Sequence, residues 1–397
     1  MKQIISLQLK FRKQLPKVIG NKDYAELENL LINIDNILSN NGFDMLAIEH
    51  IFKNNPKLKT NEKGADIALK AFRIIVLQSL IDVPFRKMSI EIAHSELYIW
   101  FVHIDDFASN EIRVPSKSTI NRFEKYIDKE FINILIIKLT KFSTIKNNEK
   151  TNNPLKLKNA LEIKELFADT TCIETNIHYP VDWKLLLDGV KTLIKSIIYI
   201  RKHGIISRIQ NPKIFISEMN KLSIAISQSA RVKYGKKNRK KSFRKMKKIT
   251  RRVMKHAEKY LELLTNEANN HDFSINQVKN ISNRMISILD QLPKAIKNAH
   301  ERIIGERKVL NSEKIFSLYE KETEILVRKK SGKEVEFGNK LLIVENKTGL
   351  IVDYDFMKNQ KNDSKLLIPI VKRVMKNYAE NKIKSITTDR GFVGKKK

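Results

Sequence analysis

The chain has 397 residues, of which 42% are apolar and 8% aromatic, a composition that excludes a wholly disordered protein and predicts two or three domains. Lys and Arg number 76 against 44 Asp and Glu, a formal net charge of +32, so the expected partner is a polyanion rather than a small molecule. The single cysteine, Cys172, excludes an intramolecular disulfide and a cysteine-cluster zinc site. The sequence contains no recognisable signal peptide and no membrane-spanning apolar segment, which predicts a cytoplasmic protein with no membrane partner.

Residues 1–150 have the pattern of a helical N-terminal domain. Apolar residues from Ala65 to Leu80 recur at helical spacing and stop before Pro84, and a second helix is expected around Met88 and Ile92. A third helix is expected after Pro115, where Ser116 or Ser118 can cap it.

The third predicted helix has an apolar stripe and a polar face. The stripe contains Ile120, Phe123 and Ile127, and the opposite face carries Lys117, Asn121, Arg122 and Lys125. That face suits the last helix of a helix-turn-helix in a DNA groove. A small helical domain with an ordinary solvated face explains the same residues equally well.

Residues 160–182 change character. The segment Leu166–Ile173 has the β-branched and aromatic bias of a strand, yet Asp169 lies at its centre. An aspartate in such a place is either a turn or edge residue or a ligand held rigidly on a sheet.

Residues 183–311 are expected to form a basic helical insertion. Apolar residues follow a three-four spacing from Phe243 to Leu264 and again from Val278 to Ile303, with a polar stretch between the two runs. This pattern predicts two long helices packed as an antiparallel hairpin.

The first of these long helices carries a dense run of positive charge. Fourteen Lys and Arg and no acid lie between Arg231 and Lys255, and their mutual repulsion favours an anionic partner over a merely solvated face. We expect contacts to the nucleic-acid phosphate backbone, which position a protein without reading bases. The candidate DNA-binding residues here are Lys236, Lys237, Arg239, Lys240, Lys241, Arg244, Lys245, Lys248, Arg251 and Arg252.

Residues 312–397 return to an α/β pattern. Strands are expected at Val335–Glu345 and Leu350–Phe356 with a turn between them, then a helix after Asp363, then a short strand that ends at Asp389. Together with the strand around Asp169, this order predicts an α/β fold with a mixed sheet.

Asp169 and Asp389 are 220 positions apart, and each lies in or just after a predicted strand. If the two strands are neighbours, both carboxylates project to one place and can share Mg²⁺ or Mn²⁺. Two such ions promote phosphodiester cleavage. Two acids alone are weak evidence, because a chain of this length contains many aspartates.

Several motifs, in order, resemble one family. The sequence is similar to bacterial insertion-sequence transposases of the DDE type in the segments Pro115–Phe123, Ala168–Pro180, Asp182–Val190, Val335–Gly338, Asp363–Leu367 and Thr388–Phe392. The resemblance implies an RNase H-like catalytic core from residues 160–182 and 312–397, with Asp169 and Asp389 as the first two catalytic, metal-binding acids.

The resemblance also implies an activity. Transposon ends would be nicked by water and the freed 3′-hydroxyl would attack target DNA, with Mg²⁺ at both steps and a homo-oligomer on the DNA. Thr170, Asn176 and His178 would surround the first acid without an assigned role.

One departure from the family pattern is expected to matter. The third acid of the family, a glutamate on a helix after the second aspartate, has no counterpart in the eight residues after Asp389. We therefore expect a C-terminally truncated, incomplete core with exposed apolar residues such as Ile386 and Phe392, weak metal binding and little strand transfer. The alternatives are a non-catalytic basic nucleic-acid-binding protein and a different RNase H-like nuclease.

Overall fold

The computed structural model describes residues 14–15, 18–61, 63–104, 112–148, 152–209, 211–229, 234–268, 271, 273–330, 333–357, 363–381 and 383–392. The chain divides into two compact units. The first unit consists of residues 1–169, 343–355 and 362–397, and the second of residues 170–342 and 356–361.

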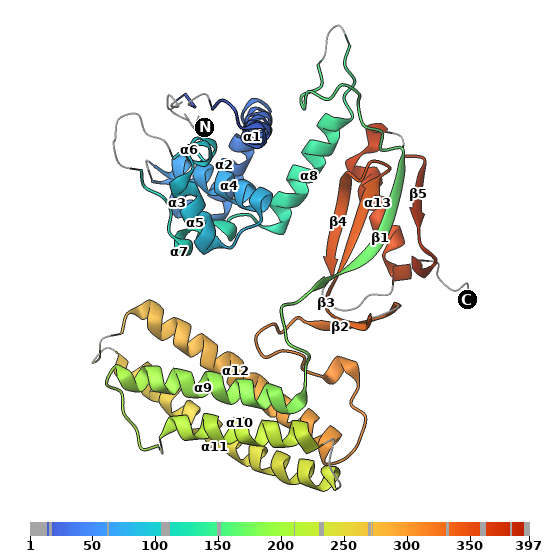
Figure 1. Ribbon diagram of the computed structural model, residues 1–397. Helices are drawn as coiled ribbons and strands as arrows, with labels where there is room; N and C mark the ends of the chain where they lie inside the picture. The colour runs from blue at the N-terminus through green and yellow to red at the C-terminus, as the bar shows by residue number, and fades with distance from the viewer. Residues whose placement is uncertain are drawn as a thin grey trace. The chain divides into compact units, whose positions relative to one another are not determined.

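The first unit begins with helices (Figure 1). They are α1 (Lys22–Asn40), α2 (Phe43–Asn54), α3 (Pro56–Lys59), α4 (Gly64–Ile81), α5 (Phe85–His94), α6 (Glu96–Phe101), α7 (Lys117–Glu124) and α8 (Lys129–Ser143). The helices predicted from Ala65 to Leu80, around Met88 and Ile92, and after Pro115 are therefore confirmed. Ser116 caps α7 by accepting a hydrogen bond from the backbone N–H of Thr119.

Most buried apolar residues of these helices form one core, and a smaller cluster between α2 and α4 contains Ile48, Ile51, Phe52, Ala68 and Leu69. Ile120 and Phe123 of α7 are buried against Phe72 of α4 and Met88 of α5, as the spacing predicted. Burial of such a stripe stabilises the helix that carries it.

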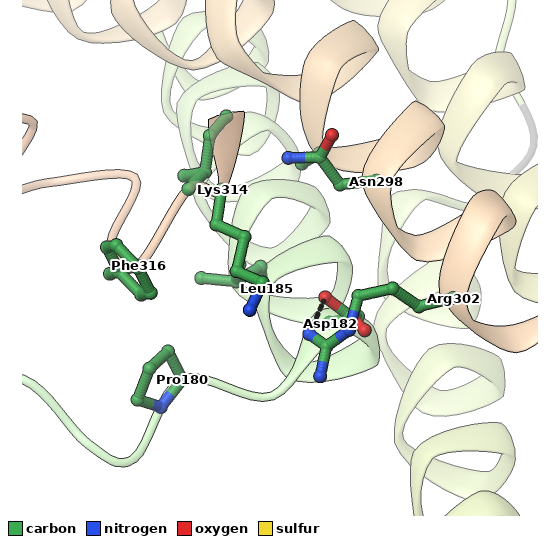
Figure 2. A pocket seen from close by; sticks show the side chains of 9 residues that line it. Pro180, Asp182, Leu185, Asn298, Arg302, Lys314 and Phe316 are labelled. Atoms are coloured by element: carbon green, nitrogen blue, oxygen red, sulfur yellow. Dashed lines mark hydrogen bonds and ion pairs between the residues drawn. The ribbon is translucent and has the colours of Figure 1, made fainter. Parts of the chain in front are cut away.

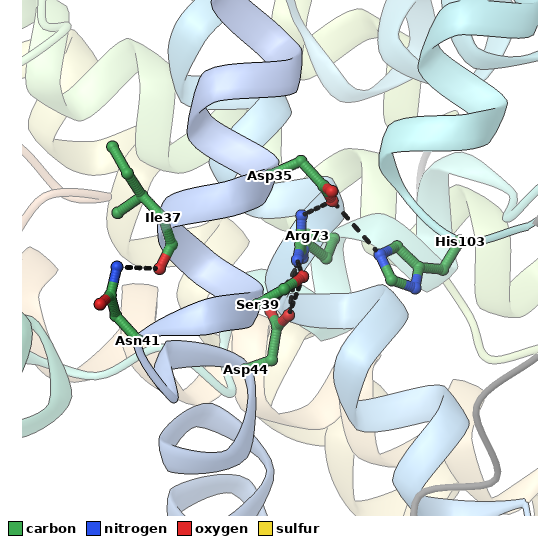
Figure 3. A network of polar contacts seen from close by, with 7 residues as sticks. All are labelled: Asp35, Ile37, Ser39, Asn41, Asp44, Arg73 and His103. Atoms are coloured by element: carbon green, nitrogen blue, oxygen red, sulfur yellow. Dashed lines mark hydrogen bonds and ion pairs between the residues drawn. The ribbon is translucent and has the colours of Figure 1, made fainter. Parts of the chain in front are cut away.

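One buried cation crosses this core. Arg73 of α4 is completely buried and donates to Asp35, Ser39 and Asp44, at 2.7 Å to the Oδ1 of Asp35 and 2.8 Å to the Oγ of Ser39 (Figure 3). His103 lies 3.7 Å from the same carboxylate of Asp35. The guanidinium therefore joins α4 to α1 and α2, whose partner residues lie 29 to 38 positions earlier in the sequence.

The sheet has five strands: β1 (Glu165–Glu174), β2 (Glu324–Lys330), β3 (Lys333–Asn346), β4 (Ile351–Met357) and β5 (Ser385–Thr388). Their order is β2-β3-β1-β5, with β4 paired to β3. The predicted α/β class with a mixed sheet is confirmed, because β2 and β3 are antiparallel whereas β1 and β5 are parallel.

The predicted turn between β3 and β4 is confirmed in detail. Gly349 has φ +80° and donates its N–H to the carbonyl of Asn346 at 3.0 Å. The side-chain oxygen of Asn346 accepts from the backbone N–H groups of Thr348 and Leu350. These hydrogen bonds give the backbone N–H groups of the turn their acceptors and fix the register of the hairpin.

Helix α13 (Leu367–Asn377) follows the hairpin and carries Ile370 and Val374 on its buried side. Just after it, Tyr378 is buried and donates its hydroxyl to the carbonyl of Val352 on β4 at 2.7 Å. The expectation that Phe392 would be exposed is wrong, since it is 2% exposed at the end of the short 3₁₀ turn Arg390–Phe392. Ile386 is half-buried.

The second unit contains four long helices, α9 (Asp182–Lys202), α10 (Pro212–Gln228), α11 (Gly235–Glu267) and α12 (Ile275–Ile303) (Figure 1). They share one apolar core, to which Leu193 of α9, Phe215 of α10, Met246 of α11 and Leu292 of α12 contribute. The predicted pair α11 and α12 is confirmed. The description as a hairpin is incomplete, because α9 and α10 cover the apolar stripes that two helices alone would leave exposed.

Candidate functional site

Asp169 and Asp389 come from two strands that lie side by side. β1 and β5 pair in parallel, and the last two residues paired in this register are Ala168 and Thr388. Asp169 and Asp389 follow this pair directly, so the register brings them opposite each other. Cα atoms of neighbouring strands lie about 4.8 Å apart in the hydrogen-bonding direction.

Both aspartates are exposed to solvent. Leu166, Ala168 and Thr170 of β1 are buried, whereas Phe167 and Asp169 between them are exposed. In the register, Thr387 is the partner of Phe167 and is exposed like it, and Asp389, the first residue after β5, is exposed too. Both acids are therefore accessible from solvent.

A third carboxylate lies near Asp389. The chain turns after β5, and the backbone N–H of Gly391 donates to the Oδ1 of Asp389 at 2.6 Å. A Cβ atom on Gly391 would lie 2.9 Å from this oxygen and 3.3 Å from the Oδ2 of Asp363. The side chain that any other residue would bring to position 391 would therefore crowd both carboxylates.

The donor chemistry of these acids suits a hard cation, although the geometry is loose. Among the described residues, no group of three or more His, Cys, Asp and Glu side chains is arranged to hold a metal ion. Mg²⁺ is commonly held by one or two carboxylates, with water and phosphate oxygens completing its shell. Asp169 and Asp389 fit this minimal pattern and lack the ligands that a closed structural metal site requires.

The residues that follow the first acid have separate environments. Thr170 is buried and Asn176 is exposed. His178 pairs with Asp188 at 2.7 Å, Nε2 to Oδ2, and its Nδ1 lies 3.2 Å from the carbonyl of Tyr179. The imidazole of His178 is thus fixed by its own neighbours within the second unit.

The candidate phosphate contacts on α11 form a long basic face. The buried residues of this helix follow one stripe that includes Phe243, Met246, Thr250 and Val253. The candidate cations lie outside that stripe: Arg239 and Lys240 are half-buried, and the exposed ones are Lys236, Lys237, Lys241, Arg244, Lys245, Lys248, Arg251 and Arg252. Arg231, at the start of the run, lies outside the described residues.

Little negative charge from the protein neutralises this face. Within the part of the chain that the structure describes, the ion pairs of these candidate cations are those of Lys236 and Lys240 with Glu306, at 3.4 and 2.8 Å. Charge repulsion and burial together lower the pKa of the half-buried His256 on the same helix, with burial the larger cause and Arg252 the next. From Lys236 to Arg252 the face extends for about 24 Å at 1.5 Å per residue.

A second basic face belongs to α7. Lys117, Asn121 and Arg122 are exposed there, opposite the buried Ile120 and Phe123. The helix packs against α4 and α5. Exposure of these three side chains is what a groove-binding helix needs, and their role in DNA binding remains a prediction.

A small cavity lies at the start of α9, lined by Asp182, Asn298, Arg302 and Lys314 among others (Figure 2). Arg302 donates to Asp182 at 2.9 Å. Burial raises the pKa of Asp182, and Arg302 opposes this shift. The ion pair joins α9 to α12. The cavity has a volume of about 20 Å³, which is room for one water molecule and too small for a larger ligand.

Sequence reasoning missed two acids near the candidate residues. The sequence pattern marks Asp363 as the start of a helix and gives no sign that it lies near Asp389. It gives no sign either that Glu306 pairs with two lysines of α11. Each belongs to a loop or turn whose placement depends on tertiary contacts. The only hint for Asp363 was that it begins one of the segments on which the family resemblance rests.

Comparisons with family models, curated proteins and solved structures found no match to this chain. None of the helices in the described ranges combines the length and the apolar character that crossing a bilayer requires.

Proposed function

We propose that this chain is a DNA transposase of the DDE type, which binds DNA through its basic helical insertion and cleaves and joins it with Mg²⁺ or Mn²⁺ at Asp169 and Asp389. The observation that carries the proposal is the parallel pairing of β1 with β5, in a register that brings the two aspartates opposite each other, both exposed to solvent. The two acids are 220 positions apart in the sequence; Asp169 lies in the middle of β1, and Asp389 directly follows β5.

The sheet supports an RNase H-like core. The β3–β4 hairpin pairs with one side of β1, and β5 lies parallel to β1 on the other side. Such a core holds its acids on rigid strands, where their positions vary little. Adjacent carboxylates repel each other, and a divalent cation offsets that repulsion.

The basic insertion and the two acids would have different roles. The cations of α11 hold the phosphate backbone, and Asp169 and Asp389 orient a divalent ion toward the phosphodiester to be cut. When bound, that ion supplies Lewis-acid stabilisation of the charge that develops on the phosphate oxygens. We further propose that the protein acts on DNA as a homo-oligomer.

The test is nicking of a supercoiled plasmid with Mn²⁺ or Mg²⁺ present. Asp169→Asn and Asp389→Asn should each lower the nicking rate by at least about a hundredfold. Glu165→Gln is the matched control, because Glu165 lies on the same exposed face of β1 but pairs with Lys347 at 2.6 Å. Equal nicking by the wild type and both Asp variants would contradict the proposal.

A second candidate function is a basic nucleic-acid-binding protein without chemistry. It is favoured by the absence, among the described residues, of a three-ligand metal group beside so dense a basic face. DNA binding by the wild type with no metal-dependent nicking would select this candidate.

A further inference from the structure

A basic hollow lies where α11 begins and α12 ends. Its volume is about 370 Å³. Six cations and one acid line it, together with Ile303: Lys236, Arg239, Lys240, Arg302, Arg307, Lys308 and Glu306. Nothing in the sequence pattern joined the last four of these charged residues to the α11 run.

The three cations on α11 are in an unfavourable place for a helix. Lys236, Arg239 and Lys240 lie in its first two turns, and a helix N-terminus carries partial positive charge. The first turn of α11 contains no acid, and its N-cap residue, Tyr234, makes no side-chain cap. The helix start therefore repels its own side chains unless an anion lies beside it.

Glu306 supplies that anion from outside the helix. Its Oε1 lies 2.8 Å from the Nζ of Lys240 and its Oε2 3.4 Å from the Nζ of Lys236. These hydrogen bonds, that of Lys240 first, lower the pKa of Glu306. The residue adopts φ +53°, a left-handed conformation that residues with a Cβ rarely take.

The carboxylate of Glu306 does not neutralise the positive charge of the hollow. Arg302 pairs with Asp182 and Arg307 with Glu301, both at 2.9 Å. Arg239 and Lys308 have no acid partner among the described residues. The hollow therefore keeps an excess of positive charge after its protein partners are counted.

We propose that this hollow is a binding site for a backbone phosphate of nucleic acid, and that the Glu306 carboxylate occupies the site until a phosphate displaces it. The proposal rests on the DNA binding proposed above. The hollow is continuous with the basic face of α11, because Lys236, Arg239 and Lys240 belong to both. A phosphate suits the lining because arginine donates to it in a bidentate manner and lysine pairs with it as a point charge.

The test of this phosphate site compares two variants that each remove one negative charge from the second unit. Glu306→Gln removes the competing carboxylate, and Glu258→Gln removes an exposed carboxylate further along α11. The readout is the affinity of the full chain for a short labelled DNA duplex between about 50 and 200 mM salt.

Glu306→Gln should raise the affinity about three- to tenfold and steepen the slope of log K against log salt, since two lysines become available to the phosphate. Glu258→Gln should change the affinity less than twofold. The double variant Arg239→Gln with Lys308→Gln should weaken binding and flatten the slope by about 2.

Each outcome separates the two proposals. Equal effects of Glu306→Gln and Glu258→Gln, or an unaltered salt slope in the double variant, would overturn the proposed phosphate-binding site and leave the proposed DNA binding intact. A wild-type chain that fails to bind DNA would overturn both. If inorganic phosphate protects the hollow from chemical modification of Lys240 but DNA does not, the site takes free phosphate and the proposal is wrong.

Discussion

Two groups of cations in this molecule show opposite solutions to the same electrostatic problem. Arg73 is completely buried, and its guanidinium meets Asp35, Asp44 and Ser39 (Figure 3). The candidate DNA-binding cations along α11 are mostly exposed. Among the described residues, Glu306 is the one acid that forms ion pairs with them. A buried charge requires its partners within the protein, whereas an exposed run without acids leaves its balance to a partner molecule.

Breaking the buried network tests the first half of this comparison. Arg73→Met should lower the free energy of unfolding by about 3 to 5 kcal/mol, because Asp35 and Asp44 would stay buried without a cation. The measurement is the denaturant midpoint of the full chain. Lys22→Met, at an exposed ion pair with Glu26, should cost less than about 1 kcal/mol. A stable Arg73→Met protein would show that the network is dispensable.

Neutralising the exposed face tests the second half. Changing Lys237, Lys241, Arg244 and Lys248 to Gln should weaken DNA binding by about a hundredfold or more and flatten the salt slope by up to about 4. The free energy of unfolding should stay equal or rise slightly, because like charges are removed from one helix.

A charge-matched control distinguishes local contact from net charge. It changes four exposed lysines of the same unit that lie outside the basic run to Gln: Lys195, Lys213, Lys221 and Lys279. Comparable loss of affinity in both quadruple variants would show that α11 has no special role.

The smallest expected effect comes from the loss of one buried, neutral hydroxyl. Tyr378 is buried, and burial raises the pKa of its hydroxyl to about 12. Tyr378→Phe should cost about 1 kcal/mol at neutral pH, because the carbonyl of Val352 loses its donor.

The pH dependence of this tyrosine has a defined sign. The pKa in the folded state lies above the unfolded value near 10, so the stabilisation is complete below about pH 10 and is lost as the pH rises toward 12. Unfolding measured across this range should show an alkaline decline that Tyr378→Phe reduces. An identical decline in both proteins would assign it to other groups.

The elements that the sequence predicted have local signals, whereas α1–α3, α6, α8–α10 and β2 were not predicted one by one. Ser116 capping α7, the Asn346–Gly349 turn and the apolar stripes of α11 and α12 each depend on residues close together in the chain. The strand β1 was recognised from its β-branched residues around Asp169.

The features that sequence reasoning missed depend on distant partners. Arg73 lies 29 and 38 residues from Asp44 and Asp35, so nothing local marks it as buried. The exposure expected for Phe392 was wrong because a 3₁₀ turn after β5 folds this ring inward. Asp363 reaches Asp389 only through tertiary folding.

The most direct test of the central claim is Mn²⁺ binding by the full chain, followed by electron paramagnetic resonance of the free ion. If Asp169 and Asp389 hold one ion together, either Asp→Asn variant should remove the site, and Glu165→Gln should retain it. Mn²⁺ binding that persists unchanged in both Asp→Asn variants would contradict the claim that these two strands carry a shared metal site.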